Sequence, residues 1–265
     1  MTDDARIRLL DELAANATIA GPVRMLDGWV LRYAPAVPFR RSNCALATGG
    51  PSALTTKELG ARCDELEAFY DHFGAPARVQ VTPIGRPTGL DPALAARGYR
   101  TEAPVDVLVA DVRVVLTNAE AVGRLDEPEP RAEVADALPT PWLADFSRAA
   151  DPIAATRAEA WARLVHDLPL ESVTAAAHRG DAVAGLGLGV FERGWLGVFG
   201  MATAPAHRRH GVASAVVRAL AGAAAARGIR RAYLQVEQDN AGARALYEVL
   251  GFRHAYSYHY RLRTD

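Results

Sequence analysis

The strongest chemical signal in the sequence is a short basic loop that leads into a predicted helix. Its residues are Arg208, Arg209, His210, Gly211, Val212, Ala213 and Ser214. The first backbone N–H groups of a helix lack intrahelical partners and lie at the positive end of the helix dipole. Small side chains at positions 211 and 213 let a ligand approach these groups. The loop therefore predicts a phosphate or diphosphate site, although an ordinary surface helix could start in the same way.

A second group of residues with chemical potential lies on the next predicted helix, residues 241–250. Asn240 can cap the first turn of this helix, and Gly251 can end it. Asn240, Ala243 and Tyr247 follow at i, i+3 and i+7, so they share one side of the helix. A ligand across this side would meet a polar cap, a small residue and a phenol. Taken alone, Tyr247 also fits a half-buried tyrosine that donates to a backbone carbonyl.

The elements around these residues form a strand, helix, strand, helix series. Strand 195–203 precedes the loop, helix 212–227 follows it, and strand 232–236 precedes Asn240. A helix of this length can serve as the right-handed crossover that a pair of parallel strands requires. The pattern therefore predicts two parallel strands beside the loop.

The remaining segments predict a mixed α/β protein in two parts. In the second part, helices at 141–148 and 154–166 precede strands at 173–178 and 183–191, which short turns join into antiparallel hairpins. In the first part, the periodicities predict helices at 7–14, 56–73 and 92–97 and strands at 29–33, 43–47, 79–81 and 105–109. Residues 124–130, with two prolines and three acids, form the predicted linker between domains at 1–123 and 131–265.

Composition narrows the class of protein. The 265 residues are 50% hydrophobic and 23% charged, and 30 basic against 31 acidic residues give a net charge of -1. This balance argues against a nucleic-acid partner and against attachment to a membrane surface. The sequence shows no signal peptide and no apolar run of membrane-spanning length. Cys44 and Cys63 are too few for a disulfide framework or a metal site, so we expect a cytoplasmic protein without a metal.

The segment 199–252 resembles the GNAT superfamily of N-acetyltransferases. The acetyl-CoA loop of that family reads Arg/Gln-x-x-Gly-x-Gly/Ala, and residues 208–213 match this pattern. The preceding Thr203-Ala204-Pro205 and the series from Asn240 through Tyr247 to Gly251-Phe252 match in order and spacing. Each element alone is weakly specific, but both at the correct separation form a strong signal. The resemblance is clear over about the last quarter of the chain and extends with less detail over residues 131–265.

The resemblance implies the GNAT fold, a central mixed and mostly antiparallel sheet with splayed parallel strands, flanked by helices. The layout further resembles two-domain GNAT proteins in which a smaller, degenerate GNAT-like domain precedes an active one. Residues 1–123 contain no loop that matches residues 208–213 and no Asn and Tyr pair before Gly98-Tyr99. We therefore expect no catalytic residue in the first domain.

The resemblance also implies acetyl-CoA, or coenzyme A, as the co-substrate. Its pantetheine would pair with the backbone of Met201, Ala202 and Thr203, and its diphosphate would bind N–H groups of residues 209–214. A bulge near Met201 would free a backbone N–H for the thioester oxygen. Asn240, Ala243 and Tyr247 would border the co-substrate, with Tyr247 as the general acid for the departing thiolate. Glu237 is the nearest carboxylate that could act as base, although the family often uses a chain of waters.

The implied reaction is transfer of an acetyl or short acyl group to a primary amine by direct attack, without a covalent enzyme intermediate. A small-molecule amine is favoured over a protein N-terminus or lysine, because the first domain would narrow access. In the family, the loop at 149–154 borders the acceptor site, and Phe199 and Met201 could restrict acyl length. A non-catalytic acyl-CoA-binding regulatory module remains the alternative, and both a monomer and a homodimer remain open.

Overall fold

The computed structural model describes residues 3–123 and 130–263, which fold into two compact units. Unit 1 comprises Met1–Asp106, Glu237–Asp239 and Ala255–Asp265. Unit 2 comprises Val107–Val236 and Asn240–His254. The chain passes between the units more than once, so each unit contains segments that are far apart in the sequence. Most of the predicted linker, residues 124–129, lies outside the described residues, and the predicted domain boundary there stays a prediction.

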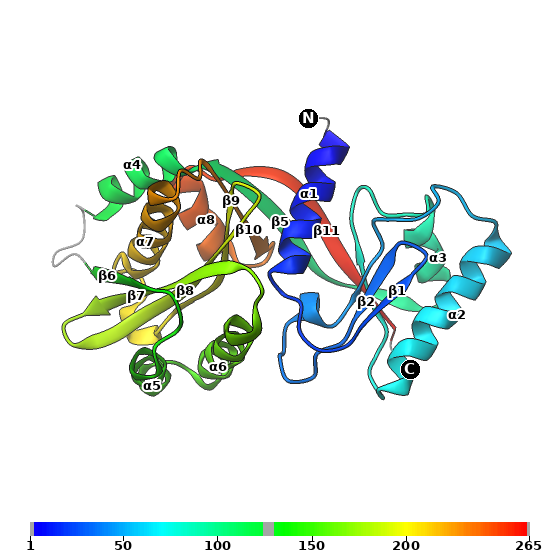
Figure 1. The fold of residues 1–265 in the computed structure, drawn as a ribbon, viewed down its shortest axis with the longest axis horizontal. Coiled ribbons are helices and arrows are strands. Elements are labelled where there is room, and N and C mark those ends of the chain that lie inside the picture. Colours follow the sequence, from blue (N-terminus) through cyan, green and yellow to red (C-terminus); the bar gives the residue numbers. More distant parts are fainter. Residues whose placement is uncertain (1–2, 124–129, 264–265) are drawn as a thin grey trace. The chain divides into compact units, whose positions relative to one another are not determined.

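Unit 1 is a mixed sheet with helices packed against it (Figure 1). Its elements are α1 (Asp3–Asn16), β1 (Val23–Leu26), β2 (Trp29–Arg32), a 3-10 turn (Arg40–Ser42), β3 (Ala45–Leu46), α2 (Thr56–His72), β4 (Arg78–Val81), α3 (Leu90–Ala96), the first part of β5 (Tyr99–Asp111) and most of β11 (Arg253–Arg263). The strand order is β1-β2-β3-β4-β11-β5. The pair β3 and β4 is parallel, whereas β1/β2, β2/β3 and β4/β11 are antiparallel.

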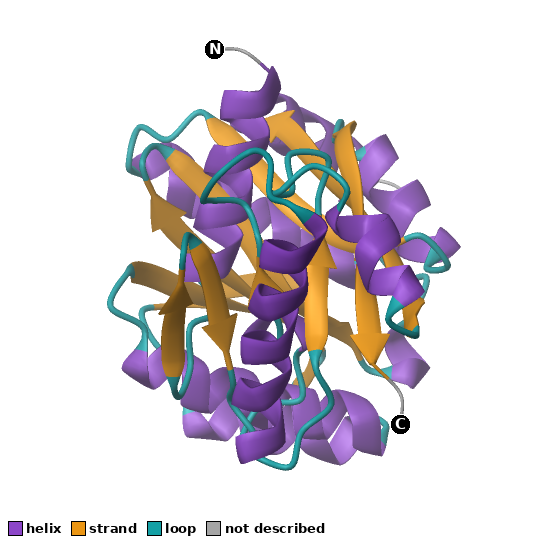
Figure 2. Ribbon diagram, turned by 90° about the vertical axis from the view of Figure 1, so that its right-hand side faces the viewer, coloured by secondary structure: helices purple, strands orange, loops and turns teal. Residues whose placement is uncertain are grey.

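Helix α2 shows how the sequence builds unit 1. The hydroxyl of Thr55 accepts from the N–H of Glu58, and the Glu58 carboxylate accepts from the N–H of Thr55, so a capping box starts the helix. Leu59, Leu66 and Tyr70 then recur on one side of the helix and are buried against the strands. Figure 2 shows the length of this helix in front of the sheet.

Unit 2 contains both parallel and antiparallel strands, with helices on both faces (Figure 1). Its elements are α4 (Val112–Gly123), β6 (Arg131–Ala135), α5 (Thr140–Ala149), α6 (Pro152–Asp167), β7 (Glu171–Arg179), β8 (Ala182–Glu192), β9 (Trp195–Thr203), a 3-10 turn (Pro205–His207), α7 (Val212–Ala226), β10 (Arg231–Glu237) and α8 (Ala241–Val249). The strand order is β5-β10-β9-β8-β7-β6. Helices α4 and α7 pack together on one face, and α5 and α6 cover the other.

The predicted fold class is confirmed by the pairing in unit 2. The strands from β6 to β9 pair antiparallel, and β9 and β10 form the predicted parallel pair with α7 as the crossover. Glycine in β8 lets α7 lie very close to the sheet. A Cβ atom on Gly187 would lie 2.5 Å from Cγ1 of Val216 and 2.8 Å from Sδ of Met201, so no larger residue fits there without movement.

Several predicted bounds differ from the structure, for local reasons. The predicted strand 43–47 shrinks to Ala45–Leu46, because the Asn43 side chain bonds to the backbone of Ala34, Val37 and Phe39 and holds a loop. Helix α4 was not predicted, because its first residues, Val112 to Val115, include three β-branched valines; packing against α7 supplies the stabilisation that propensity lacks. Val249 is an apolar residue of α8 at helical spacing from Leu246 and Leu250 of the core, but it is 57% exposed.

Both cysteines are free and buried, as expected for small apolar side chains. Burial raises the pKa of the Cys63 thiol to about 11, which keeps it protonated at neutral pH. Within residues 3–123 and 130–263, no helix is long and apolar enough to cross a membrane.

Candidate active site

The parallel strands β9 and β10 separate toward their C-terminal ends. Their ladder runs from Trp195↔Arg231 to Val198↔Leu234 and ends there. On the other side of β9, the register with β8 shifts between Leu186 and Leu188, which places an extra residue in β9 at Gly200 and Met201. The predicted splay and the predicted bulge near Met201 are both confirmed. Within the described part of the chain, the backbone from Gly200 to Thr203 therefore has no strand partner on the β10 side.

The loop after β9 presents the start of α7. Arg209 and Gly211 both adopt positive φ, at 65° and 67°, and Gly211 is the N-cap residue of α7. The first intrahelical bond runs from the N–H of Ala215 to the carbonyl of Gly211 at 2.9 Å. The N–H groups of residues 212–214 precede that bond, and a glycine cap has no side chain to offer them. Backbone N–H groups in this geometry suit an anion, and the diphosphate site at residues 209–214 stays a prediction.

Ser214 adds a polar side chain to these N–H groups at the start of α7. The residue is 2% exposed, and its Oγ has no hydrogen-bond partner within the described part of the chain. Buried hydroxyls nearly always have a partner, because an unpartnered one costs about 1–3 kcal/mol. The Ser214 hydroxyl is therefore available to a ligand held at the start of α7.

Arg208 is held by a contact that the sequence did not predict. Its Nη2 lies 3.2 Å from Oδ2 of Asp151, while Oδ1 of the same carboxylate accepts from the N–H of Ala154 and caps α6. Asp151 thus connects the basic loop to the α5–α6 loop. Arg209 and His210 are exposed to solvent beside it.

Helix α8 carries the predicted stripe. Oδ1 of Asn240 accepts from the N–H of Ala243 at 3.1 Å, which confirms Asn240 as the N-cap, and Gly251 ends the helix at φ 93°. Tyr247 is buried, and its ring packs edge-on against Phe252 with 5.8 Å between centroids. Its hydroxyl makes no hydrogen bond to any described residue, and burial raises its pKa to about 12. A tyrosine with a purely structural role would donate to a backbone carbonyl, and no carbonyl of a described residue accepts from this hydroxyl.

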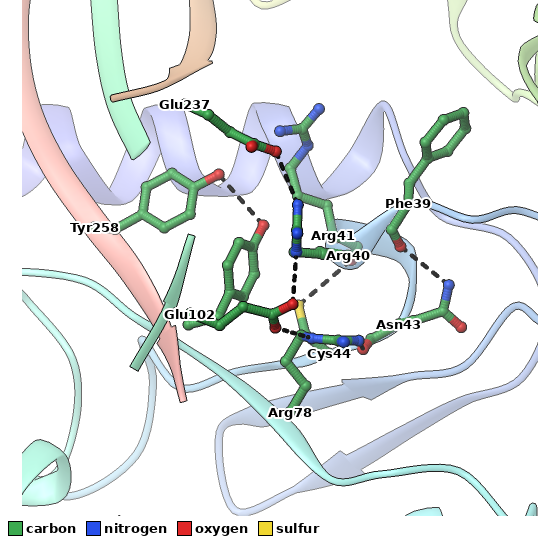
Figure 3. Close-up of polar contacts among 10 residues, drawn as sticks. Phe39, Arg40, Arg41, Asn43, Cys44, Arg78, Glu102, Glu237 and Tyr258 are labelled. Carbon is green, nitrogen blue, oxygen red and sulfur yellow. Dashed lines mark hydrogen bonds and ion pairs between the residues drawn. The ribbon is translucent and has the colours of Figure 1, made fainter. Parts of the chain in front are cut away.

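Glu237, the candidate base, belongs to an ion-pair chain in unit 1 (Figure 3). Its Oε1 accepts from Nη1 of Arg40 at 2.8 Å, and Nε of Arg40 donates to Oε1 of Glu102 at 3.0 Å. Glu102 also accepts from Arg78 at 2.9 Å. Burial opposes ionisation of Glu102, but the bonds from Arg78 and Arg40 hold its pKa below the usual range. Glu237 is therefore paired with a guanidinium.

A comparison with protein families decides the class of this site. The Acetyltransferase (GNAT) family matches residues 132–252, which include the split strands, the loop and α8. Residues 132–252 belong to the GNAT family. The prediction made from the loop and the second helix is confirmed, and with it the class of enzyme, an acetyl-CoA-dependent N-acetyltransferase.

Proteins similar to this chain match it over nearly its whole length. The protein named uncharacterized N-acetyltransferase YobR of Bacillus subtilis (strain 168) is 24% identical over 262 residues, which are 97% of this chain and 98% of that protein. A GCN5-related N-acetyltransferase from Kribbella flavida superposes with a TM-score of 0.71 at 15% identity, covering 98% of this chain and 95% of that one. A tandem GNAT protein from the clavulanic acid biosynthesis pathway gives 0.68 at 14% identity, covering 96% and 89%. The two solved structures share the fold.

The residues of the GNAT site fit coenzyme A. Unpaired N–H groups at the start of α7 and the unpartnered Ser214 hydroxyl suit a diphosphate, and the free backbone of β9 suits the amides of pantetheine. Arg208 and Arg209 add positive charge at the same place. Among the described residues, no group of three or more His, Cys, Asp or Glu side chains could hold a metal ion.

Two features of the GNAT domain were not predictable from sequence motifs. Gln235 on β10 is one: both polar atoms of its side chain are buried and have no hydrogen-bond partner in the described part of the chain. The only sign of Gln235 in the sequence was a single polar residue within an otherwise apolar strand. The other is an apolar pocket on the α6 side of the sheet, which includes Trp161 and Gly200. No sequence signal marked it, because core residues and pocket residues have the same composition.

Proposed function

We propose that the protein transfers an acetyl group from acetyl-CoA to the primary amine of a small molecule, by direct attack and without a covalent enzyme intermediate. One observation carries the proposal. The hydroxyls of Ser214 and Tyr247, for which no partner occurs among residues 3–123 and 130–263, come from the two helices that follow the separated strands β9 and β10. One is suited to a diphosphate and the other to the leaving sulfur.

Acetyl-CoA, when bound, supplies an acetyl thioester, and the protein positions it. The N–H groups of residues 212–214 and the Ser214 hydroxyl would hold the diphosphate. The backbone of Met201, Ala202 and Thr203 would pair with pantetheine along the edge that β10 leaves free. The bulge at Gly200 and Met201 would direct a backbone N–H at the carbonyl oxygen, where negative charge grows during acyl transfer.

The reaction forms a C–N bond and breaks a C–S bond, so the amine loses one proton and the sulfur gains one. A buried phenol with a pKa of about 12 stays protonated at neutral pH and can donate to the departing sulfur. A thiol with an ordinary pKa of about 8.5 is the stronger acid, so Tyr247 acts first as a hydrogen-bond donor that stabilises the thiolate. Because Glu237 is paired with Arg40, the proton of the amine passes to water in this mechanism.

The alternative is a regulatory module that binds acyl-CoA and performs no chemistry. The experiment that separates the two follows free thiol release from acetyl-CoA in the presence of a panel of primary amines, with calorimetry of coenzyme A binding in parallel. We expect binding, and amine-dependent thiol release equal to the amount of N-acetylated product found by mass spectrometry. Binding without release for any amine would favour the regulatory module, and absence of binding would defeat both functions.

A further inference from the structure

Asp151 uses its two carboxylate oxygens for two different parts of unit 2. Oδ1 accepts from the N–H of Ala154 at 2.9 Å and caps α6, and Oδ2 lies 3.2 Å from Nη2 of Arg208. The cap is a local bond that already holds the carboxylate in one orientation. Formation of the ion pair therefore has to order only the side chain of Arg208, which lowers the entropy cost that weakens most exposed pairs.

The chain around Asp151 is also packed against β9. Ala150 and Asp151 make up the connection between α5 and α6. Ala150 and Ala154 pack on an apolar cluster whose core includes the fully buried Ala204, and Ala202 of β9 packs on the same cluster. The proposed function assigns the backbone of Ala202 to pantetheine. The α5–α6 connection is therefore held at two places, by apolar packing on this part of β9 and by the ion pair with the basic loop of residues 208–214.

Arg208 can bind a carboxylate and a phosphate at the same time. It stands at the start of the basic loop, directly before Arg209. Its side chain is 58% exposed, so outside the ion pair it would sample many rotamers. Nη2 faces Asp151, and the donors on Nε and Nη1 are suited to the oxygens of a phosphate. A guanidinium bound to both groups would connect a ligand at the basic loop to the carboxylate that caps α6.

From these contacts we propose that Asp151 is a positioning residue that couples the basic loop to α6. It holds the guanidinium of Arg208 in one place, and a diphosphate bound at the loop fixes Arg208 and, through Asp151, the first turn of α6. Coupling of this kind is reciprocal, so the ordered turn of α6 also strengthens coenzyme A binding. The inference rests on the proposed function, because it takes residues 209–214 as the diphosphate site.

The first test follows backbone hydrogen exchange of the whole protein with and without coenzyme A. We expect coenzyme A to slow exchange at residues 209–214 and, by about two-fold to five-fold, in the first turn of α6. In that turn the N–H groups of Ala154 and Ala155 bond to Asp151. Asp151→Ser keeps a capping hydroxyl but removes the charge, so it should abolish the effect in α6 and leave the effect at residues 209–214. Arg208→Gln should do the same without any change in α6 itself.

Arg148→Gln is the matched control for this test. It breaks an exposed ion pair with Asp145 on α5, at 2.7 Å, and should leave both effects in place. Exchange that slows at residues 209–214 but not in α6 of the unmodified protein would overturn the proposal. So would an effect in α6 that persists in both Asp151→Ser and Arg208→Gln.

A double-mutant cycle on the Kd of coenzyme A separates positioning from a simple effect of charge. Asp151→Ser should weaken binding by about two-fold to five-fold, because a released Arg208 loses more rotamer freedom when it binds a phosphate. In an Arg208→Gln background the same substitution should have no further effect. An equal change of Kd in both backgrounds would contradict the proposal, because the carboxylate would then act on the ligand without Arg208. Failure of the proposed function is distinguishable, since the unmodified protein would then bind no coenzyme A.

Discussion

The two units of this protein use their polar side chains differently. In unit 1, charged groups are paired with each other: Glu102 binds Arg40 and Arg78, and Glu67 accepts from Arg97 and from the hydroxyl of Tyr99. In unit 2, three polar side chains beside the separated strands have no partner among the described residues, namely those of Ser214, Gln235 and Tyr247.

Unit 1 also has buried polar atoms without a partner among the described residues, including Arg32 Nη1 and Thr82 Oγ1, so the position of Ser214, Gln235 and Tyr247 beside the separated strands is what indicates where the chemistry lies. A buried polar group without a partner costs about 1–3 kcal/mol, so a folded protein retains one mainly where a ligand completes the bond. The ion pairs of unit 1 already satisfy their members and leave little for a ligand to bind. The four substitutions below test two expectations. Changes at the unpartnered groups should affect binding or catalysis, and changes at the paired groups should affect stability only.

The largest effect on coenzyme A binding should come from Gly211→Val. A branched side chain at the N-cap of α7 would cover the N–H groups of residues 212–214, so we expect coenzyme A binding to weaken by more than about 100-fold, or about 2.7 kcal/mol, in isothermal calorimetry. Gly228→Val is the matched control, because Gly228 follows the other end of the same helix at a similar φ of 72° with no atom near its Cβ position. Equal affinity in a folded Gly211→Val protein would refute the diphosphate assignment.

Tyr247→Phe should lower kcat by about 100-fold to 10,000-fold, because it removes the donor to the departing sulfur. The Kd of coenzyme A should stay within a few-fold of the unmodified value. Tyr258→Phe removes a buried hydroxyl of unit 1 that bonds to the Tyr260 hydroxyl at 3.4 Å and to Arg41, and it should leave kcat unchanged. A parallel loss of rate and affinity in Tyr247→Phe would make this tyrosine structural.

Asp11→Asn tests the buried carboxyl of unit 1. Burial raises the pKa of Asp11 to about 7 against a bond from Tyr256 at 2.6 Å. Between about pH 4 and pH 7 the unfolded chain has lost this proton and the folded chain retains it, so the free energy of unfolding falls as pH rises, by about 4 kcal/mol in total. We expect Asp11→Asn to unfold at higher denaturant than the unmodified protein at pH 8 and at similar denaturant at pH 4. Parallel curves for the two proteins across this range would contradict the assignment.

The smallest effect should come from Glu237→Gln. The pair that it breaks with Arg40 is partly exposed, and such pairs contribute less than about 1 kcal/mol, so stability and kcat/KM should change little. Glu102→Gln, which breaks bonds to both Arg40 and Arg78, should destabilise the protein more without slowing the reaction. A Glu237→Gln enzyme slowed by about 100-fold, with the basic limb of its pH profile lost, would restore Glu237 as the general base.

Much of the site was predictable because its signals are local. A glycine before a helix, an asparagine cap with Tyr247 seven residues later, and a glycine stop each report on a few neighbouring residues, and the helices α7 and α8 form where those signals place them. Predictions that needed distant contacts were less accurate. Val249 has an apolar side chain at core spacing but lies exposed, and the valine-rich start of α4 becomes helical by packing against α7.

The sequence alone determined the class of the protein, because backbone N–H groups at a helix start and a phenol on the next helix are set by short-range rules of spacing and capping. Only the tertiary structure decided which side chains are left without partners. Glu237 is bound to an arginine almost 200 residues away in the sequence, while Gln235, two residues earlier, has buried polar atoms and no partner among the described residues. Hydrogen-bond satisfaction depends on which segments meet in space, and no local pattern encodes those meetings.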